Sequence, residues 1–598
     1  YLALAWTQVR TLGTALAPTF DVDNVLVEQP TLVLASMFSH NMILQREKSV
    51  PVWGTSEPGA AITVEFAGQT NTITAAGDGT WRVDLDPMVA STNSRTLTVT
   101  AELDSNTEVV TCNNVLVGEV WLCSGQSNME LRLSTTDNGA AVVAAATHPT
   151  LRLCMVPIVA SSNTPLERID ADWSECTPGT VGDMSGVAYY FARKLQTELD
   201  VPVGIINSSK GGTEIELWYP DSGEYFNGMI AAQVPFAMRG VIWYQGENNV
   251  TDGMLYVDKK KTLVEAWRAL WGYDFPFYYV QIAPFNYGGG RAGALPYFWE
   301  AQSAILDEIP GTGMAVITDT VVNLEGIHPS NKEPVGQRLA LLALDNTYGQ
   351  DIVSTGPTFQ SVRLVGTTLE VTFDSAVGLT TSDAEAPDLF ELAGDDGTFV
   401  PATATIDEPN GKVTLSNTGV ALPVSMRFAW SQTAQPNLRN GAGLVPAAFR
   451  ATSPRATWLG DNSLTDSDWA SNADGDSLNN LLEFAFGTDP AVSDGGSIAY
   501  GSGVTPGLPV PILETITSNN VEFRAAFGRR KDWDTAGLTY TVQFSADLTE
   551  WVDSADTPLE IESGSGDIDA VYVPYPLAFP TSGGDEKAQF FRLNVSQD

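Results

Sequence analysis

Basic residues, histidine and cysteine are scarce in this chain of 598 residues. The 31 Lys and Arg residues stand against 72 Asp and Glu residues, and the formal net charge at pH 7 is −41. Nucleic acids and anionic membranes are bound mainly through basic patches, so neither is expected as a partner. The acidity suits a secreted protein, a salty medium or calcium binding, and charge alone does not choose among the three.

Long apolar runs are absent as well. The longest, such as 140–146, are far shorter than the run of about 18 residues that a transmembrane helix needs, so no membrane span is expected. The opening residues 1–6 (YLALAW) resemble the remnant of a secretory signal, and an ordinary N-terminal segment is the alternative explanation.

Four cysteines and three histidines leave little material for metal or disulfide sites. No Cys-x-x-Cys pair occurs, so structural zinc is not expected. Cys154 and Cys176 are candidates for a disulfide, and free buried cysteines are the alternative.

The length corresponds to about four domains. Alternating apolar residues between turn signals predict strands, whereas residues 113–350 alternate short apolar runs with helical patterns. The second pattern predicts a doubly wound α/β domain with a parallel sheet. The expected order is an N-terminal segment (1–28), a β-sandwich-like domain (29–112), the α/β domain (113–350), a second β domain (351–452) and a C-terminal extension (453–598).

A serine lies where the first strand of the α/β domain ends. Residues 115–122 predict a buried strand, and the small residues of 124–127 lead into a polar helical segment. Ligands of open α/β sheets bind at the carboxyl ends of strands, and backbone N–H groups at a helix start stabilise an oxyanion. Ser127 is therefore a candidate nucleophile. A helix N-cap is the alternative role for a serine at this position.

A serine nucleophile needs a base, which is usually a histidine. His40 lies in the first β domain and is expected to be an exposed loop residue without chemistry, and His148 lies in a connecting stretch. Only His328 follows a strand of the same domain as Ser127. Glu325, three residues upstream, is able to orient a histidine ring.

Four ordered segments resemble the sialate O-acetylesterase family, a branch of the SGNH hydrolases. Further matches lie in the flanking β domains (37–45, 51–54, 427–430 and 437–440), so the resemblance covers about residues 30–452. The four segments are GQSNME at 125–130, NSSKGGTEIELW at 207–218, GVIWYQGENN at 240–249 and IHPSNK at 327–332 with GQRLA at 336–340. The resemblance implies a central flavodoxin-like SGNH domain flanked by β-sandwich-like domains.

The resemblance also implies roles for individual residues. Ser127 would be the nucleophile and His328 its base, with no cofactor for catalysis. The oxyanion hole would use the N–H groups of Ser127 and of Gly211 or Gly212, and a side-chain amide, with Gln245 preferred to Asn248. The expected pocket residues are Gln126, Asn128, Trp218, Trp243 and Glu247. For Trp218, Trp243 and Glu247, core packing is the alternative role.

The third member of the triad stays open. Glu325 stands where SGNH enzymes often have an aspartate, and it is the first candidate for the orienting carboxylate. Asp319, or a Ser–His dyad held by a backbone carbonyl, are the alternatives. Lys332 and Glu130 are interpreted as local salt-bridge or capping residues.

The C-terminal extension contains an acidic loop of 12 residues, 472–483 (NADGDSLNNLLE). Its spacing resembles calcium loops of EF-hand or dockerin type, although Ser477 stands where such loops prefer glycine. One interpretation is that this loop binds a structural calcium ion, and the other is that it is a solvated acidic linker. The expected ligands are Asn472, Asp474, Asp476, the Leu478 carbonyl, Asn480 and Glu483.

The leading functional prediction is a secreted, periplasmic or cell-surface bacterial esterase that removes O-acetyl groups from sialic acid or acetylated polysaccharides. The alternative is a carbohydrate-binding or adhesion protein on a hydrolase scaffold, and a lipase-like esterase is a third reading. The sequence leaves the sugar, the acetylated hydroxyl and the oligomeric state open.

Overall fold

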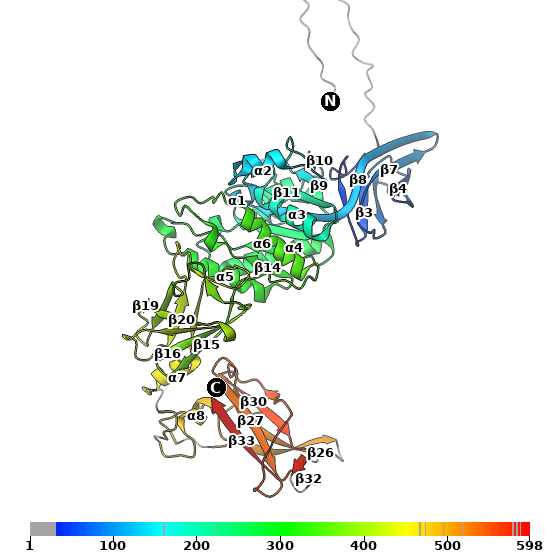
Figure 1. Cartoon of the computed structure of the whole chain (residues 1–598). Coiled ribbons are helices and arrows are strands. Elements are labelled where there is room, and N and C mark those ends of the chain that lie inside the picture. Colours follow the sequence, from blue (N-terminus) through cyan, green and yellow to red (C-terminus); the bar gives the residue numbers. More distant parts are fainter. Residues whose placement is uncertain are drawn as a thin grey trace, which may run out of the picture.

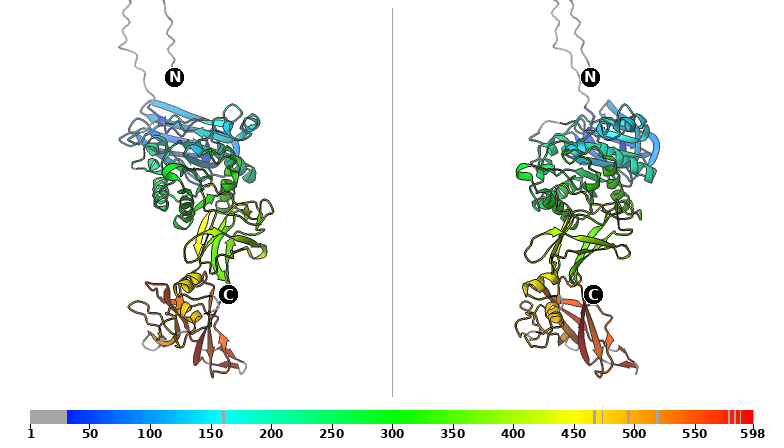
Figure 2. Two further views of the ribbon diagram at one scale, coloured as in Figure 1. Left: turned by 90° about the vertical axis from the view of Figure 1, so that its left-hand side faces the viewer. Right: turned by 60° about the vertical axis from the view of Figure 1, so that its left-hand side comes forward.

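The computed structural model describes residues 31–598 except 159–161, 221, 466–467, 473, 494–495, 518–519, 577–578, 582–583, 587 and 598. Four units follow one another through an elongated molecule, in chain order from the blue β domain to the red C-terminal unit (Figures 1 and 2). Within these described residues, no helix combines the length and apolar character that a membrane crossing requires.

The first unit is built from two sheets. In β6 every second side chain is buried, which is the alternation that the sequence shows at Trp81, Val83 and Leu85. One sheet has the order β1-β3-β6. In the other sheet, β5 pairs with β4, β4 pairs with β7, and β7 pairs with β8. The strands are β1 (Val33–Leu34), β2 (Ile43–Gln45), β3 (Val50–Thr55), β4 (Ala61–Phe66), β5 (Gln69–Thr74), β6 (Thr80–Leu85), β7 (Ser91–Leu103) and β8 (Asn106–Gly125).

The long strand β8 belongs to two units at once. Its first part pairs with β7, and from Glu119 onward it pairs with β11 in the next unit. The boundary expected between residues 112 and 113 therefore falls inside a continuous strand, which Figure 1 shows running from one unit into the other. Glu119 is fully buried at this junction and binds Arg46 and Arg239.

The second unit, the α/β domain, contains a sheet of order β10-β9-β11-β8-β12-β13-β14. Neighbouring strands along this path are parallel except for the edge pair β10–β9. All residues of β11, β12 and β13 are buried, as expected for parallel strands covered on both faces. The strands are β9 (His148–Met155), β10 (Trp173–Cys176), β11 (Val203–Ser209), β12 (Gly240–Tyr244), β13 (Phe277–Val280) and β14 (Thr312–Ala315).

The helices of the α/β domain pack in two pairs, α3 with α6 and α4 with α5. α3 packs on β11, and α6 packs on β13 and β14. This packing buries the apolar stripe of each helix on the sheet. The helices are α1 (Ser127–Glu130), α2 (Gly139–Ala145), α3 (Gly186–Leu199), α4 (Leu255–Trp271), α5 (Leu295–Glu308) and α6 (Glu333–Asn346).

The four cysteines are all buried and unpaired. Cys154 lies opposite Trp173 in the antiparallel β9–β10 pair, whereas Cys176 lies opposite His148. The two cysteines thus lie at different ends of the ladder, and of the two alternatives the structure shows free buried cysteines rather than a Cys154–Cys176 disulfide. Burial raises the pKa of the Cys112 thiol to about 11, which keeps it protonated and unreactive at neutral pH.

The third unit follows α6 and consists of β strands. Its sheets have the orders β15-β16-β21-β20, β19-β18-β22-β24 and β17-β23. The strands are β15 (Thr358–Val365), β16 (Thr368–Asp374), β17 (Thr380–Thr381), β18 (Phe390–Ala393), β19 (Val400–Pro401), β20 (Thr403–Asp407), β21 (Lys412–Ser416), β22 (Ser425–Phe428), β23 (Leu438–Arg439) and β24 (Phe449–Thr452).

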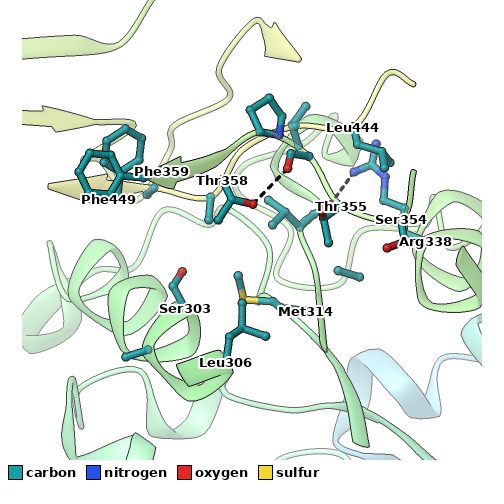
Figure 3. Close-up of a pocket in the computed structure, with 18 of the residues that line it drawn as sticks. Ser303, Leu306, Met314, Arg338, Ser354, Thr355, Thr358, Phe359, Leu444 and Phe449 are labelled. Atoms are coloured by element: carbon teal, nitrogen blue, oxygen red, sulfur yellow. Dashed lines mark hydrogen bonds between the residues drawn. The ribbon is translucent and has the colours of Figure 1, made fainter. Parts of the chain in front are cut away.

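A cavity of about 300 Å³ lies at the seam between the α/β domain and this β unit. Figure 3 shows Leu306 and Met314 from the α/β domain facing Phe359 and Phe449 from the β unit. The two phenylalanine rings stack with centroids 4.8 Å apart. The lining of the seam mixes apolar side chains with polar ones such as Arg338 and Ser354, and Ser127 and His328 do not line it.

The C-terminal unit begins with two short helices, α7 (Pro454–Asp461) and α8 (Asn480–Phe486). Its sheets have the orders β25-β26-β30-β29, β28-β27-β33 and β31-β32. The strands are β25 (Val510–Thr517), β26 (Asn520–Arg530), β27 (Leu538–Ser545), β28 (Val552–Asp553), β29 (Leu559–Glu562), β30 (Ile568–Pro574), β31 (Phe579–Thr581), β32 (Gly584–Glu586) and β33 (Phe590–Gln597).

Candidate active site

Ser127 is presented by a sharp turn at the carboxyl end of β8, in the middle of the sheet. Gly125 pairs with Ser209 of β11 on one side and with Tyr244 of β12 on the other. It has a φ of 134°, and a Cβ added there would lie 2.2 Å from the Tyr244 carbonyl oxygen. Only glycine fits this turn, which directs the chain from the strand into α1 at Ser127.

His328 reaches Ser127 from a different strand end. It lies in the loop between η7 (Thr318–Thr320) and α6, and its Nε2 atom is 2.8 Å from the Ser127 Oγ atom. Both residues line a shallow hollow of about 340 Å³, together with Glu130, Leu131, Arg132 and Thr135. The structure thus brings together a serine and a histidine that are 201 positions apart in the sequence.

Neither carboxylate considered as the orienting group reaches His328 in the described hydrogen bonds. Glu325 is exposed, and its Oε1 atom accepts a hydrogen bond from Asn286 Nδ2 at 2.8 Å. Asp319 forms a two-pronged ion pair with Arg338 at 2.6 and 2.7 Å. The loop carries Glu325 away from the imidazole, so proximity in sequence does not become contact here.

The backbone of Gly211 lies directly beside the nucleophile. A Cβ added to Gly211 would lie 3.2 Å from the Ser127 Cβ atom. The Gly211 N–H group donates to the Glu130 carboxylate at 2.5 Å. Gly212 follows with a positive φ of 75°, and its carbonyl accepts a hydrogen bond from Asn248 Nδ2 at 2.7 Å. Glu130, interpreted above as a local capping residue, thus occupies a backbone donor of the site.

Gln245, the first choice for the oxyanion amide, points into the protein interior. It is fully buried, and its Nε2 atom donates to the Thr213 carbonyl and to Asn249 Oδ1. Its Oε1 atom accepts from the Tyr256 hydroxyl. Its amide group is consumed by these contacts, and this expectation is wrong. Asn248 is less buried and lies beside Gly212.

The two tryptophans expected in the pocket belong to the core. Trp218 and Trp243 are both fully buried and pack edge to face, with ring centroids 5.9 Å apart. Trp218 donates its indole N–H to Thr213 Oγ1. Gln126 is also buried, and its Oε1 atom accepts from the Gly246 N–H, which joins the turns after β8 and β12.

A buried polar chain lies behind the Ser127–His328 pair. Asn128 is fully buried and donates to Glu247 Oε1 at 2.5 Å and to the Ile327 carbonyl at 3.0 Å. Its Oδ1 atom accepts from Lys332 Nζ at 2.6 Å. Asn128, which follows Ser127 in the sequence, is therefore joined to Ile327, which precedes His328. The sequence interpretation of Lys332 as a local salt-bridge or capping residue missed this role, although its place in the histidine segment was a signal.

Burial shifts the pKa values of the ionisable residues in and beside this buried hydrogen-bond network. Desolvation raises the pKa of Glu247, against the hydrogen bonds that it accepts. Desolvation lowers the pKa of Lys332 to about 7, against the attraction of Glu247. Burial, and next the charge of Lys332, also lower the pKa of His328, while Glu130 raises it. The histidine is thus held neutral at neutral pH, as a general base must be.

Comparison with known proteins identifies the class. Residues 117–343, which contain Ser127 and His328, match the model of a carbohydrate esterase family described as sialic acid-specific acetylesterase. A solved carbohydrate acetylesterase from Xanthomonas citri is 36% identical, with a TM-score of 0.66, and the match covers 70% of this chain and 99% of that one. The fold and site are those of a carbohydrate esterase.

Two curated relatives agree with the family model and the solved structure. The mouse sialate O-acetylesterase is 26% identical over an alignment of 482 residues, and the match covers 66% of this chain and 89% of the relative. The human sialate O-acetylesterase is 28% identical over an alignment of 458 residues, and the match covers 66% of this chain and 87% of the relative. The chain belongs to the sialate O-acetylesterase family, as the four sequence segments predicted.

Proposed function

We propose that this protein is a serine esterase that removes O-acetyl groups from carbohydrates through an acetyl-Ser127 intermediate. The observation that carries the proposal is the distance of 2.8 Å between Ser127 Oγ and His328 Nε2 at the carboxyl end of the sheet. A histidine within hydrogen-bond reach takes the hydroxyl proton as the oxygen attacks. The strand order and the two helix pairs support a doubly wound, flavodoxin-like arrangement of this domain.

The proposed reaction has two steps. Ser127 Oγ attacks the acetyl carbonyl carbon while its proton passes to His328 Nε2, and the sugar oxygen leaves with that proton. Water then attacks the acetyl-serine, gives its proton to His328, and acetate leaves as Ser127 recovers the proton. Because no carboxylate contacts His328 among the described residues, we propose a Ser–His dyad rather than a triad through Glu325.

The negative oxygen of each step needs donors near Ser127. We propose the N–H groups of Ser127 and Gly211, with Asn248 as the side-chain donor; removing one such donor costs about 3–4 kcal/mol of transition-state stabilisation. The Gly211 N–H is held by Glu130 in the ligand-free chain, so the Glu130 carboxylate has to leave it when the oxyanion forms. The negative charge of the Glu130 carboxylate and that of the oxyanion repel each other, which also favours this movement of Glu130.

The pH dependence follows from the neutral histidine. The value of kcat/KM is expected to rise with pH through an inflection below 6.5, the ordinary pKa of histidine, because burial lowers the pKa of His328. Glu130→Gln removes the carboxylate that raises this pKa, so the inflection is expected to move to still lower pH. Steady-state kinetics between about pH 4.5 and 8 on both proteins measure the shift. A shift to higher pH in the variant would show that Glu130 does not act on the base in this way.

The substrate class is tested by acetate release. Wild-type protein is incubated with O-acetylated sialic acid, acetylated plant and algal polysaccharides, and long-chain acyl esters, and free acetate or fatty acid is measured. We expect release from at least one acetylated carbohydrate and little from long acyl chains, because the hollow at Ser127 is shallow and has polar and charged side chains in its lining. Glycan binding without any acetate release would instead favour the binding-protein alternative.

A further inference from the structure

The acidic loop before α8 folds its carboxylates around one point. Ligand oxygens of Asp474, Asp476 and Glu483 all lie within 4.8 Å of one another. Glu483 is fully buried, and Asp474 and Asp476 are half-buried. Three carboxylates at this spacing repel one another, so the arrangement needs positive charge at its centre.

Each aspartate uses only one of its two oxygens for the loop itself. Asp474 Oδ1 accepts the Asp476 N–H at 3.1 Å, and Asp476 Oδ1 accepts the Leu478 N–H at 2.6 Å. The Oδ2 atoms of both residues are shielded from solvent and have no hydrogen-bond partner. Buried carboxylate oxygens without a donor are unfavourable in a protein that binds nothing there.

Asn480 gives independent evidence for a ligand. Its side chain is fully buried, its Nδ2 atom donates to the Asp468 carbonyl, and its Oδ1 atom has no partner. Asn480 and Glu483 are three positions apart on α8, so both side chains lie on the same face of the helix. The asparagine oxygen therefore lies on the face that carries the Glu483 carboxylate, and it is the neutral ligand type that calcium accepts.

We propose that residues 474–483 bind one Ca²⁺ ion through Asp474, Asp476, Asn480, Glu483 and the Leu478 carbonyl. Several carboxylates with neutral oxygens form a hard-oxygen ligand set that suits calcium. Asn472 is exposed, and its Oδ1 atom accepts the Gly475 N–H at 2.7 Å, so this residue shapes the loop. The ligands come from both the loop and the first turn of α8, so the ion fixes one against the other.

The ion would also stabilise the joint between the third and fourth units. Leu478, Phe484 and Phe486 belong to one apolar cluster with residues of the C-terminal strands. Phe484 packs on Trp469, which stacks on Trp458 of α7 with ring centroids 5.5 Å apart. Calcium binding therefore orders the segment through which α7 connects the β unit to the C-terminal sheets.

The test uses the full chain after removal of metals with a chelator. Titration calorimetry with CaCl₂ is expected to show one ion bound, and calcium is expected to raise the midpoint of a thermal transition by about 5 °C or more. Glu483→Gln and Asp476→Asn are expected to weaken binding by at least about tenfold, because each removes a negative ligand. Asp556→Asn, the same loss of charge on an exposed loop of this unit, is the matched control and is expected to bind normally.

Two results would overturn the proposal. One is the absence of both heat and a thermal shift with wild-type protein at millimolar calcium. The other is unchanged affinity in both ligand variants, with circular dichroism showing that they are folded. Acetate release by wild-type protein is expected to be the same with and without calcium, because the loop lies outside the α/β domain, so this test and the test of the esterase are independent.

Discussion

Replacing Ser127 with alanine is expected to lower kcat/KM for acetate release by about 10⁴-fold or more. The substitution removes the only atom that would form the covalent intermediate, and His328 then has no hydroxyl to deprotonate. His328→Ala is expected to cause a loss of similar size. The double variant is expected to be no worse than either single one, because the two residues act as one unit. Initial rates of acetate release on a single defined substrate measure all three proteins.

Matched variants separate the chemical role from damage to the fold. Ser127→Ala is expected to keep the thermal midpoint of the wild type, since Ser127 lies at the edge of the hollow. Glu325→Gln is expected to change kcat/KM by less than about threefold, because its oxygen binds Asn286. Asn248→Ala is expected to lower kcat by about 10²-fold through the loss of one oxyanion donor. A large effect of Glu325→Gln would restore the triad, and full activity of Ser127→Ala would refute the serine mechanism.

Sequence patterns located the two strand ends of the site but not the contacts behind them. Local order along the chain was enough to select Ser127 from its strand-turn pattern and His328 by setting aside His40 and His148. The structure brings Ser127 and His328 together. The direction of the Gln245 amide depends on Thr213, Asn249 and Tyr256, which come from other segments. Sequence periodicity does not identify partners from distant segments, and so the Gln245 amide was predicted to face the site rather than the interior.

The same limit applies to the fold. A boundary at residue 112 follows from the change in pattern from alternating strands to strands with helices. β8 nevertheless continues across it, because a single strand is able to pair with β7 at one end and β11 at the other. Likewise, two cysteines separated by a short loop look suitable for a disulfide until the β9–β10 register places them at different positions of the ladder. Register is set by tertiary pairing, which spacing alone does not report.

The second large effect is expected from Asn128→Ala. The amide side chain satisfies three groups at once: the buried Glu247 Oε1 and Lys332 Nζ atoms and the half-buried Ile327 carbonyl. Truncation leaves these groups without that partner in the interior, and we expect the free energy of unfolding to fall by about 3–5 kcal/mol. Because Ile327 precedes His328, the histidine loop is also released, and kcat is expected to fall by about 10²-fold. Chemical denaturation and steady-state kinetics measure the two effects.

Glu247→Gln is the matched control for this network. Glutamine keeps the oxygen that accepts from Asn128 Nδ2, so the link between the serine turn and the histidine loop stays intact. The comparison is made at about pH 8, where Lys332, with its pKa lowered to about 7, is mostly neutral and does not require the Glu247 charge. We expect a change of no more than about 1 kcal/mol in stability and a small change in kcat. If Asn128→Ala unfolds at the same denaturant concentration as the wild type, the amide does not hold the two loops together. If Glu247→Gln is as damaging as Asn128→Ala, the carboxylate charge, rather than the asparagine bridge, organises the site.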